Sequence, residues 1–391
     1  MPEASKAAQS NRFILLYALA WAGGAVAYTP FLTILLPVRI SVLAGAGSDI
    51  AWLAYVAFSG AIAASVGNIA FGYLSDITGN RRGWITLGMA LSCTLLIVTS
   101  AARTLPQLIA AVVLWQLSLN MMLAPLAAWA ADRVPDHQKG LLGGMLAFAP
   151  GLAGLFGAVV THPGLAGSTG RLVLVALAVM SCVAPALVIR SAAANGSTGT
   201  ETLPVQMPAT FGKMWLARLA IQVSEAAMFS YLYFWFRAID PTMSENQAAR
   251  VLSVVLVMSA PAALFAGRWA DRTNRPLFPL IACAIFSAVG LLAMALAGDV
   301  YQAIGAYGLF GLASSVFLAL HSAQTMRVLP RSDRRGRDLG VLNLTNTVPS
   351  LLMPWITIMV VPLFGFSGLF ALLAALAAGA GLLLAVATPK G

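Results

Sequence analysis

One carboxyl group stands out because it lies deep inside an apolar run. Glu225 occupies the middle of the run 214–236, in the stretch RLAIQVSEAAMFSYLYF. If this run spans a bilayer, the charged acid costs at least ~2.5 kcal/mol there, and such residues are by default functional. Burial disfavours the charged form, which suits a group that must bind and release a proton. We predict that Glu225 couples proton movement; the alternative is a neutral, hydrogen-bonded acid that only ties helices together.

Two further polar residues share the helix face of Glu225. Arg218, Gln222 and Glu225 are spaced by four and three residues, which places them on one side of an α-helix. We expect this face to line a central cavity. Arg218 then contacts either a substrate or Glu225; the alternative is that its long side chain extends to the nearby cytoplasmic surface.

Other apolar runs carry amides and aromatic rings. Gln116 and Asn120 form an i, i+4 pair, and amides with aromatic rings suit a neutral, polyhydroxylated ligand. The same amides also serve ordinary hydrogen bonds between helices, which is the alternative for each of them. The predicted substrate cavity is lined by Trp21, Tyr28, Gln116, Asn120, Arg218, Gln222, Asn343 and Asn346.

The composition shows which kind of chain must position these groups. Of the 391 residues, 60% are hydrophobic and 9% are charged. A soluble domain has about 45–50% apolar and about 25% charged residues, so the chain belongs to the membrane class. The net charge of +10 is spread over short loops between apolar runs, which excludes a nucleic-acid-binding face.

Twelve apolar runs have the length of a membrane-spanning helix, about 20 residues. Their continuous apolar character excludes a β-barrel. The chain is therefore predicted to be an all-α membrane protein with twelve transmembrane helices. The runs are 13–37, 50–72, 84–102, 107–130, 140–161, 171–190, 214–236, 248–267, 278–297, 301–326, 339–363 and 367–388.

The positive charges predict the orientation. With both termini in the cytoplasm, 17 of the 23 Lys and Arg residues fall on the cytoplasmic side, five fall outside, and Arg218 lies within a helix. The five outer residues are Arg39, Arg103, Arg171, Arg237 and Arg250.

The two halves of the chain repeat. Gly72 and Gly267 are 195 residues apart, and the same offset joins Asp76 to Asp271. A polar, Pro-containing linker separates the halves. We predict a six-helix bundle at 1–190, a cytoplasmic linker at 191–212 and a second bundle at 213–391. Two such halves, related by an axis along the membrane normal, describe a major-facilitator-type transporter.

The stretch GYLSDITGNRR, from Gly72 to Arg82, resembles the loop 2–3 signature of the major facilitator superfamily, G-x-L-[SA]-D-R-x-G-[RK]-[RK]. It departs from that signature at Ile77 and Asn80. A Gly near a helix end allows close approach, and an acid favours the positive end of a facing helix. Asp76 is therefore expected to face the start of the helix at 339–363, as the resemblance also implies. The predicted cytoplasmic gate comprises Gly72, Asp76, Gly79, Arg81, Arg82, Asp271, Arg272 and Arg275; the alternative for Arg81 and Arg82 is that they only determine topology.

Two weaker resemblances bear on the substrate. The stretch GRDLGVLNLTNTVPS, residues 336–350, is similar to sucrose- and glycoside-type symporters, although the acid that those relatives place in helix 2 or 4 has no counterpart before Asp76. The stretch GGMLAFAPGLAGLFG, residues 143–157, partly matches the Gly-Pro motif of drug antiporters, with Ala149 in place of the Gly.

The predicted function is proton-coupled secondary transport of a small polar organic solute, sugar- or glycoside-like, by alternating access. The alternatives are a proton-driven exporter of drugs or amphipathic metabolites and a non-transporting receptor on the same fold. No nucleotide-binding loop, metal cluster or catalytic triad is visible, so neither an enzyme activity nor a cofactor is expected. The expected partners are a small-molecule substrate, protons and the lipid of a plasma (inner) membrane; nucleic acid is not expected, and the protein is expected to be monomeric.

Overall fold

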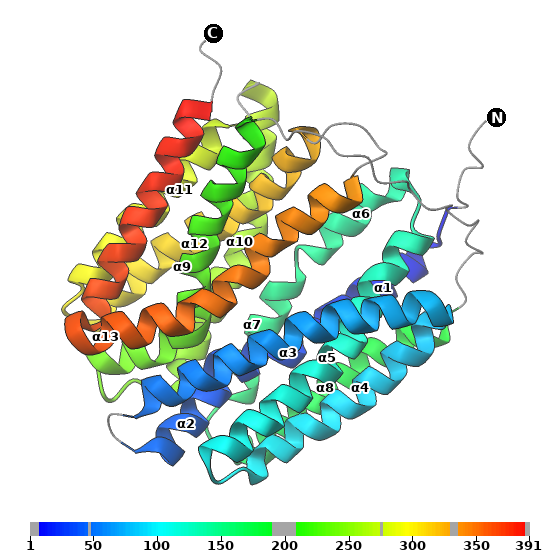
Figure 1. Ribbon diagram of the computed structural model, residues 1–391, viewed down its shortest axis with the longest axis horizontal. Helices are drawn as coiled ribbons and strands as arrows, with labels where there is room; N and C mark the ends of the chain where they lie inside the picture. Colours follow the sequence, from blue (N-terminus) through cyan, green and yellow to red (C-terminus); the bar gives the residue numbers. More distant parts are fainter. Residues whose placement is uncertain (1–7, 46–47, 190–208, 274–276, 329–334, 388–391) are drawn as a thin grey trace. The chain divides into compact units, whose positions relative to one another are not determined.

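The protein is helical throughout the part that the structure describes. The computed structural model describes residues 8–45, 48–189, 209–273, 277–328 and 335–387, and for some positions within helices it describes the backbone alone. In these residues there are helices, turns and bends but no strand (Figure 1). Helices satisfy all backbone hydrogen bonds within one segment, which is what an apolar chain requires in lipid. The predicted all-α membrane class is confirmed.

Ten stretches of described helix are long and apolar enough to cross a membrane. One of them, Thr345–Val386, contains a break at Gly365, where φ is 65°. The helix α9 (Ala209–Ile239) has 31 residues, the length of a spanning helix, but it carries Arg218 and Glu225 and is not among the ten. The predicted number of twelve spans stays a prediction.

The chain divides into two compact units. Unit 1 comprises Met1–Thr198 and Glu245–Ser253, and unit 2 comprises Gly199–Ser244 and Val254–Gly391. The helix α10 (Glu245–Thr273) therefore contributes its first nine residues to unit 1 and the rest to unit 2. The predicted linker at 191–212 lies almost entirely outside the described residues, and the predicted division at 1–190, 191–212 and 213–391 stays a prediction.

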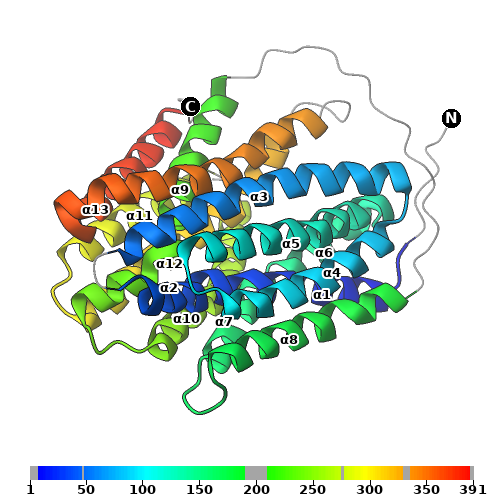
Figure 2. The same ribbon diagram turned by 60° about the horizontal axis from the view of Figure 1, so that its bottom comes forward.

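Unit 1 is built on the first helix, α1 (Asn11–Pro30), which packs against α7 and α8, while α5 packs against both α3 and α4 (Figures 1 and 2). The Tyr17 hydroxyl donates to the Leu126 carbonyl at 2.8 Å, and the rings of Phe31 and Trp115 meet edge to face at 4.7 Å. The remaining helices of unit 1 are α2 (Leu36–Ala44), α3 (Asp49–Thr78), α4 (Arg81–Val98), α5 (Leu105–Arg133), α6 (Asp136–Leu146), α7 (Ala149–Val160) and α8 (Ser168–Val188).

Unit 2 is built around α9, which packs against α12 and α13. The helix α11 packs against the same two partners (Figure 1). A Cβ on Gly290 of α11 would lie 2.7 Å from the backbone nitrogen of Phe310, so the two backbones touch at this point. Gly88 makes the same kind of contact in unit 1, where α4 meets the backbone of α5. The helices of unit 2 besides α9 and α10 are α11 (Phe278–Leu296), α12 (Val300–Val328) and α13 (Arg335–Ala387).

Two apolar runs are interrupted in ways that the hydrophobic pattern does not show, and a third break falls between two predicted runs. A π-helical turn, Phe31–Leu35, follows Pro30 and continues into α2. The run 140–161 is divided into α6 and α7 ahead of Pro150. Gly365 divides α13 between the predicted runs 339–363 and 367–388, with φ 65° and ψ −173°. That backbone region is essentially restricted to Gly. Gly365 therefore ends the first helical segment of α13, and the second segment begins after it.

Candidate functional site

Glu225 lies near the middle of α9, as the sequence predicts, and its carboxylate is bound from a neighbouring helix. The Ser314 hydroxyl of α12 donates a hydrogen bond to Glu225 Oε1. Ser314 is fully buried, and Glu225 is half-buried. In the described part of the chain no Lys or Arg forms an ion pair with Glu225. The acid therefore has a neutral donor and no fixed counter-charge.

Arg218 lies two turns before Glu225 on the same helix and is 7% exposed. Its guanidinium donates to Thr345 Oγ1 at 3.0 Å, to Ser322 Oγ at 3.0 Å, and to the Leu318 carbonyl at 3.3 Å. These contacts direct it into unit 2, toward α12 and α13. Among the described contacts, Arg218 does not pair with Glu225. Its side chain also does not extend to the surface, which was the alternative considered from the sequence.

Gln222 and Asn346 complete this group. Asn346 Oδ1 accepts hydrogen bonds from Gln222 Nε2 at 2.5 Å and from Arg218 Nη2 at 3.3 Å. Asn346 is exposed and Gln222 is half-buried, so the group extends from a buried cation to accessible amides. Three of the predicted cavity residues are thus brought together in unit 2. The side chain of Asn343, also predicted, lies outside the described residues.

The predicted cavity residues of the first half lie in unit 1, on α1 and α5. Asn120 Nδ2 donates to the Gln116 carbonyl at 2.9 Å, and Asn68 Nδ2 donates to Asn120 Oδ1 at 3.4 Å. Gln116 and Asn120 are buried. Trp21 and Tyr28 are half-buried on α1 and, being seven residues apart, lie on one side of it. Asn120 is thus bonded both within α5, to Gln116, and across to α3, through Asn68.

The motif Gly72–Arg82 forms the junction between α3 and α4. Gly79 has φ 62° and ends α3, and Asn80 Oδ1 accepts from the Gly83 amide at 3.0 Å at the start of α4. Left-handed Gly at a helix C-terminus and Asn at a helix N-terminus are the residues that such a tight junction needs. A Cβ on Gly72 would meet the Ala124 Cβ at 4.0 Å, which is ordinary packing, so the described contacts do not explain this Gly.

The charges of the motif are paired within unit 1. Arg81 forms ion pairs with Asp76 and, at 3.1 Å, with Asp132 at the end of α5. Arg82 donates to the Ile189 carbonyl and lies over the Trp129 ring at 5.3 Å. The sequence analysis did not predict Asp132 as a partner of Arg81, although an acid just after the fourth apolar run was visible in the sequence.

The expected contact of Asp76 with the helix starting near 339 stays a prediction, because the side chains of 325–344 are not described. In the second copy of the motif, Arg272 is exposed near the end of α10. Arg275 and the side chain of Asp271 lie outside the described residues.

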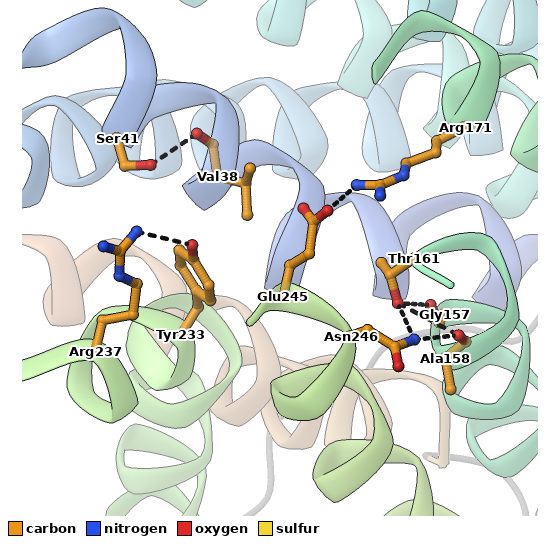
Figure 3. A network of polar contacts seen from close by, with 10 residues as sticks. All are labelled: Val38, Ser41, Gly157, Ala158, Thr161, Arg171, Tyr233, Arg237, Glu245 and Asn246. Atoms are coloured by element: carbon orange, nitrogen blue, oxygen red, sulfur yellow. Dashed lines mark hydrogen bonds and ion pairs between the residues drawn. The ribbon is translucent and has the colours of Figure 1, made fainter. Parts of the chain in front are cut away.

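A further polar group joins α8, α7 and the start of α10, all in unit 1. The Arg171 guanidinium pairs with the Glu245 carboxylate, and Asn246 Nδ2 donates to the Ala158 carbonyl at 2.8 Å and to Thr161 Oγ1 at 3.2 Å (Figure 3). Asn246 thereby satisfies a carbonyl at the C-terminal end of α7, where a helix leaves its last carbonyls without internal partners. The sequence analysis placed Arg171 on the outer side of the membrane but did not predict that it pairs with Glu245.

Ten long apolar helices in the described residues define an integral, multi-pass membrane protein. Residues 214–391 match the model of the Major Facilitator Superfamily. This match, which covers the second half of the chain, confirms there the resemblance to the major facilitator superfamily that the sequence shows.

Solved structures with the same fold include those of a bacterial homolog of the human lysosomal transporter Spinster. The inward-facing, unoccupied form has 14% identity and a TM-score of 0.69, covering 96% of this chain and 94% of that chain. The inward-facing, occupied form has 13% identity and a TM-score of 0.71, with the same coverage. At these identities the likeness concerns the fold. A comparison with curated proteins gave no match.

Proposed function

We propose that the protein is a proton-coupled secondary transporter of a small polar organic solute, sugar- or glycoside-like, that works by alternating access. Glu225 is the residue that carries the proton. We further propose that the protein is a monomer in a plasma (inner) membrane. Its distribution of Lys and Arg supports an orientation with both termini in the cytoplasm.

The observation that carries this proposal is the bond between Glu225 and Ser314. A carboxylate in the middle of a spanning helix is costly in its charged form, by at least ~2.5 kcal/mol. A counter-charge would offset this cost and hold the acid ionised, but the described partner is a neutral hydroxyl. A serine can donate to the carboxylate or accept from the carboxylic acid, so it accommodates both protonation states. Glu225 is therefore suited to alternate between them.

The amide groups support a polar substrate. Gln116 and Asn120 in unit 1 and Gln222 and Asn346 in unit 2 place donors and acceptors at several positions within apolar helices. Precisely placed polar groups among apolar ones are what a small-molecule site uses to orient its ligand.

A second candidate function is proton-driven export of drugs or amphipathic metabolites. It is favoured by the break between α6 and α7, which falls at the stretch that partly matches the antiporter motif. A third, a non-transporting receptor on the same fold, shares the architecture but moves no solute.

The test is transport by the purified full chain in liposomes with an imposed pH gradient, using labelled sugars for uptake and a dye for export. Glu225→Gln should abolish gradient-driven accumulation while solute exchange across the membrane continues, because the neutral amide cannot carry a proton. The matched control is Glu245→Gln, an acid-to-amide change on α10, which should keep the gradient response. Accumulation that survives Glu225→Gln unchanged removes the coupling role. A chain that moves no solute in either assay supports the receptor.

A further inference from the structure

Arg218 is a buried cation without a described counter-ion. Ion pairs among the described residues join Arg81 to Asp76 and Asp132 and join Arg171 to Glu245, and none includes Arg218. All four of its hydrogen bonds end on neutral oxygens, from Thr345, Ser322, Leu318 and Asn346. A charge removed from water is costly unless it is paired, and charged residues within spanning segments mark substrate or ion pathways.

Glu225 does not supply the missing charge. The two residues are seven positions apart, which is about 10 Å along a helix with a rise of 1.5 Å per residue. Their side chains share one face, but each is bound to different partners: Glu225 to Ser314, and Arg218 to hydroxyls on α12 and α13 and to the Asn346 amide. The face therefore presents a cation and an acid separated by two helical turns, with Gln222 between them.

The guanidinium also retains a donor. Arg carries five N–H donors, and the described hydrogen bonds of Arg218 are four. Nε uses its one hydrogen on Thr345, and Nη1 uses two on Leu318 and Ser322. The remaining N–H is on Nη2, the nitrogen that contacts the exposed Asn346. Both the uncompensated charge and the spare donor thus lie toward the accessible end of the group.

From this geometry we propose that the transported solute is a small organic anion whose carboxylate or phosphate group binds Arg218. The inference rests on the proposed transport function and narrows its substrate class: a sugar-like solute must carry an acidic group. The hydroxyls of Thr345 and Ser322 and the Leu318 carbonyl hold the guanidinium in place, and the anion neutralises it through Nη2. Gln222 and Asn346 then contact the polar, uncharged part of the solute.

The test compares ligands that differ in charge but hardly in shape. Purified full chain in detergent is titrated with gluconate against glucose and with glycerol 3-phosphate against glycerol, and binding is read from thermal unfolding. The native protein should bind at least one anion about tenfold or more tightly than its neutral analogue, because a hydrogen bond to a charged group is worth about that factor. The carboxylate and phosphate pairs show which acidic group is preferred.

Two variants isolate the charge of Arg218. Arg218→Gln should reduce the preference for the anion to about one, whereas Arg218→Lys should keep part of it. Asn346→Asp places a carboxylate beside the guanidinium with almost no change in shape, and should also abolish the preference; it provides the same test if Arg218→Gln fails to fold. Arg237→Gln is the matched control, since Arg237 lies on the same helix and donates to Tyr233. It should leave the preference unchanged.

Equal binding of anion and neutral analogue by the native protein overturns the inference, as does a preference that survives Asn346→Asp. A native protein that responds to none of the anions overturns it as well. These binding measurements need no proton gradient, so their outcome is independent of the transport assay. If a pH gradient drives the transport of neutral solutes only, the proposed transport function holds and the anionic substrate class is wrong.

Discussion

The Ser314 hydroxyl of α12 donates a hydrogen bond to the Glu225 carboxylate of α9, so the predicted proton carrier also ties together two helices of unit 2. When Glu225 binds a proton, its carboxyl group can donate a hydrogen bond to the Ser314 hydroxyl instead of accepting one from it. The chemistry of the site is thereby linked to the packing of the helices that form it.

Replacing Ser314 by Ala should lower both stability and transport. The loss of a hydrogen bond to a charged group costs about 1.5–3 kcal/mol. Unfolding in detergent and gradient-driven transport in liposomes measure the two effects. Ser287→Ala in α11 is the control, because the Ser287 hydroxyl is buried without a described partner, and its removal should be neutral or stabilising. Equal effects of the two changes would mean that the bond to Glu225 contributes nothing.

Replacing Gly290 by Ala should force α11 away from α12. The new Cβ would lie 2.7 Å from the Phe310 nitrogen, and a backbone atom cannot turn aside as a side chain can. Overpacking of this kind costs about 1–3 kcal/mol. Gly305→Ala in α12 is the control, since its Cβ meets nothing within 4 Å and Ala is the better helix former. A Gly290→Ala protein as stable as the control would contradict the close contact.

Replacing Gly365 by Ala should destabilise the break in α13. The backbone there has φ 65° and ψ −173°, a conformation that costs a residue with a Cβ about 1–3 kcal/mol. Gly379→Ala in the same helix should cost nothing, because it has helical angles and open space around it. The midpoint of thermal unfolding distinguishes the two, and a fall of the same size in both would indicate that the conformation at Gly365 is not the cause.

Asp76→Asn tests the predicted gate. Asp76 is well exposed, and exposed ion pairs are worth about 1 kcal/mol or less, so stability should change little. Transport should nevertheless fall, because the gate hypothesis has Asp76 also engage the start of a helix in the other half during the cycle. Asp132→Asn, which removes the other partner of Arg81, is the control and should cost less activity. Equal transport by both variants would leave Asp76 with no role beyond pairing Arg81.

The pair of Arg171 and Glu245 should contribute a measurable coupling energy. Their side chains are 14% and 22% exposed, so water screens the pair less than it screens the charges of the gate. A double-mutant cycle with Arg171→Gln and Glu245→Gln should give a coupling energy of about 1 kcal/mol. The losses of unfolding free energy from the two single changes should then add up to more than the loss from the double change. Strictly additive effects would show that the two charges do not interact in solution.

The junction of α3 and α4 shows how far local sequence reasoning reaches. The motif predicted charged groups at one end of the first half, and the structure places Arg81 between Asp76 and Asp132 there. Asp132 comes from a helix more than 50 residues away in the chain, and neither spacing nor residue type indicates that pairing. For the same reason Ser314, Ser322 and Thr345 could not be chosen in advance, because hydroxyl residues are common in spanning helices and only packing selects those that meet Glu225 or Arg218.

The sequence by itself determined the membrane class, the helical fold and the place of Glu225 at mid-helix. These follow from hydrophobic runs of spanning length and from the cost of a charge in lipid, which are properties of residues and their order. The tertiary structure decided the partners: a neutral serine for Glu225, and hydroxyl and amide groups instead of an acid for Arg218. Hydrogen bonds between helices act over about 3 Å, and that distance is set by how the helices pack, which no pattern along the chain records.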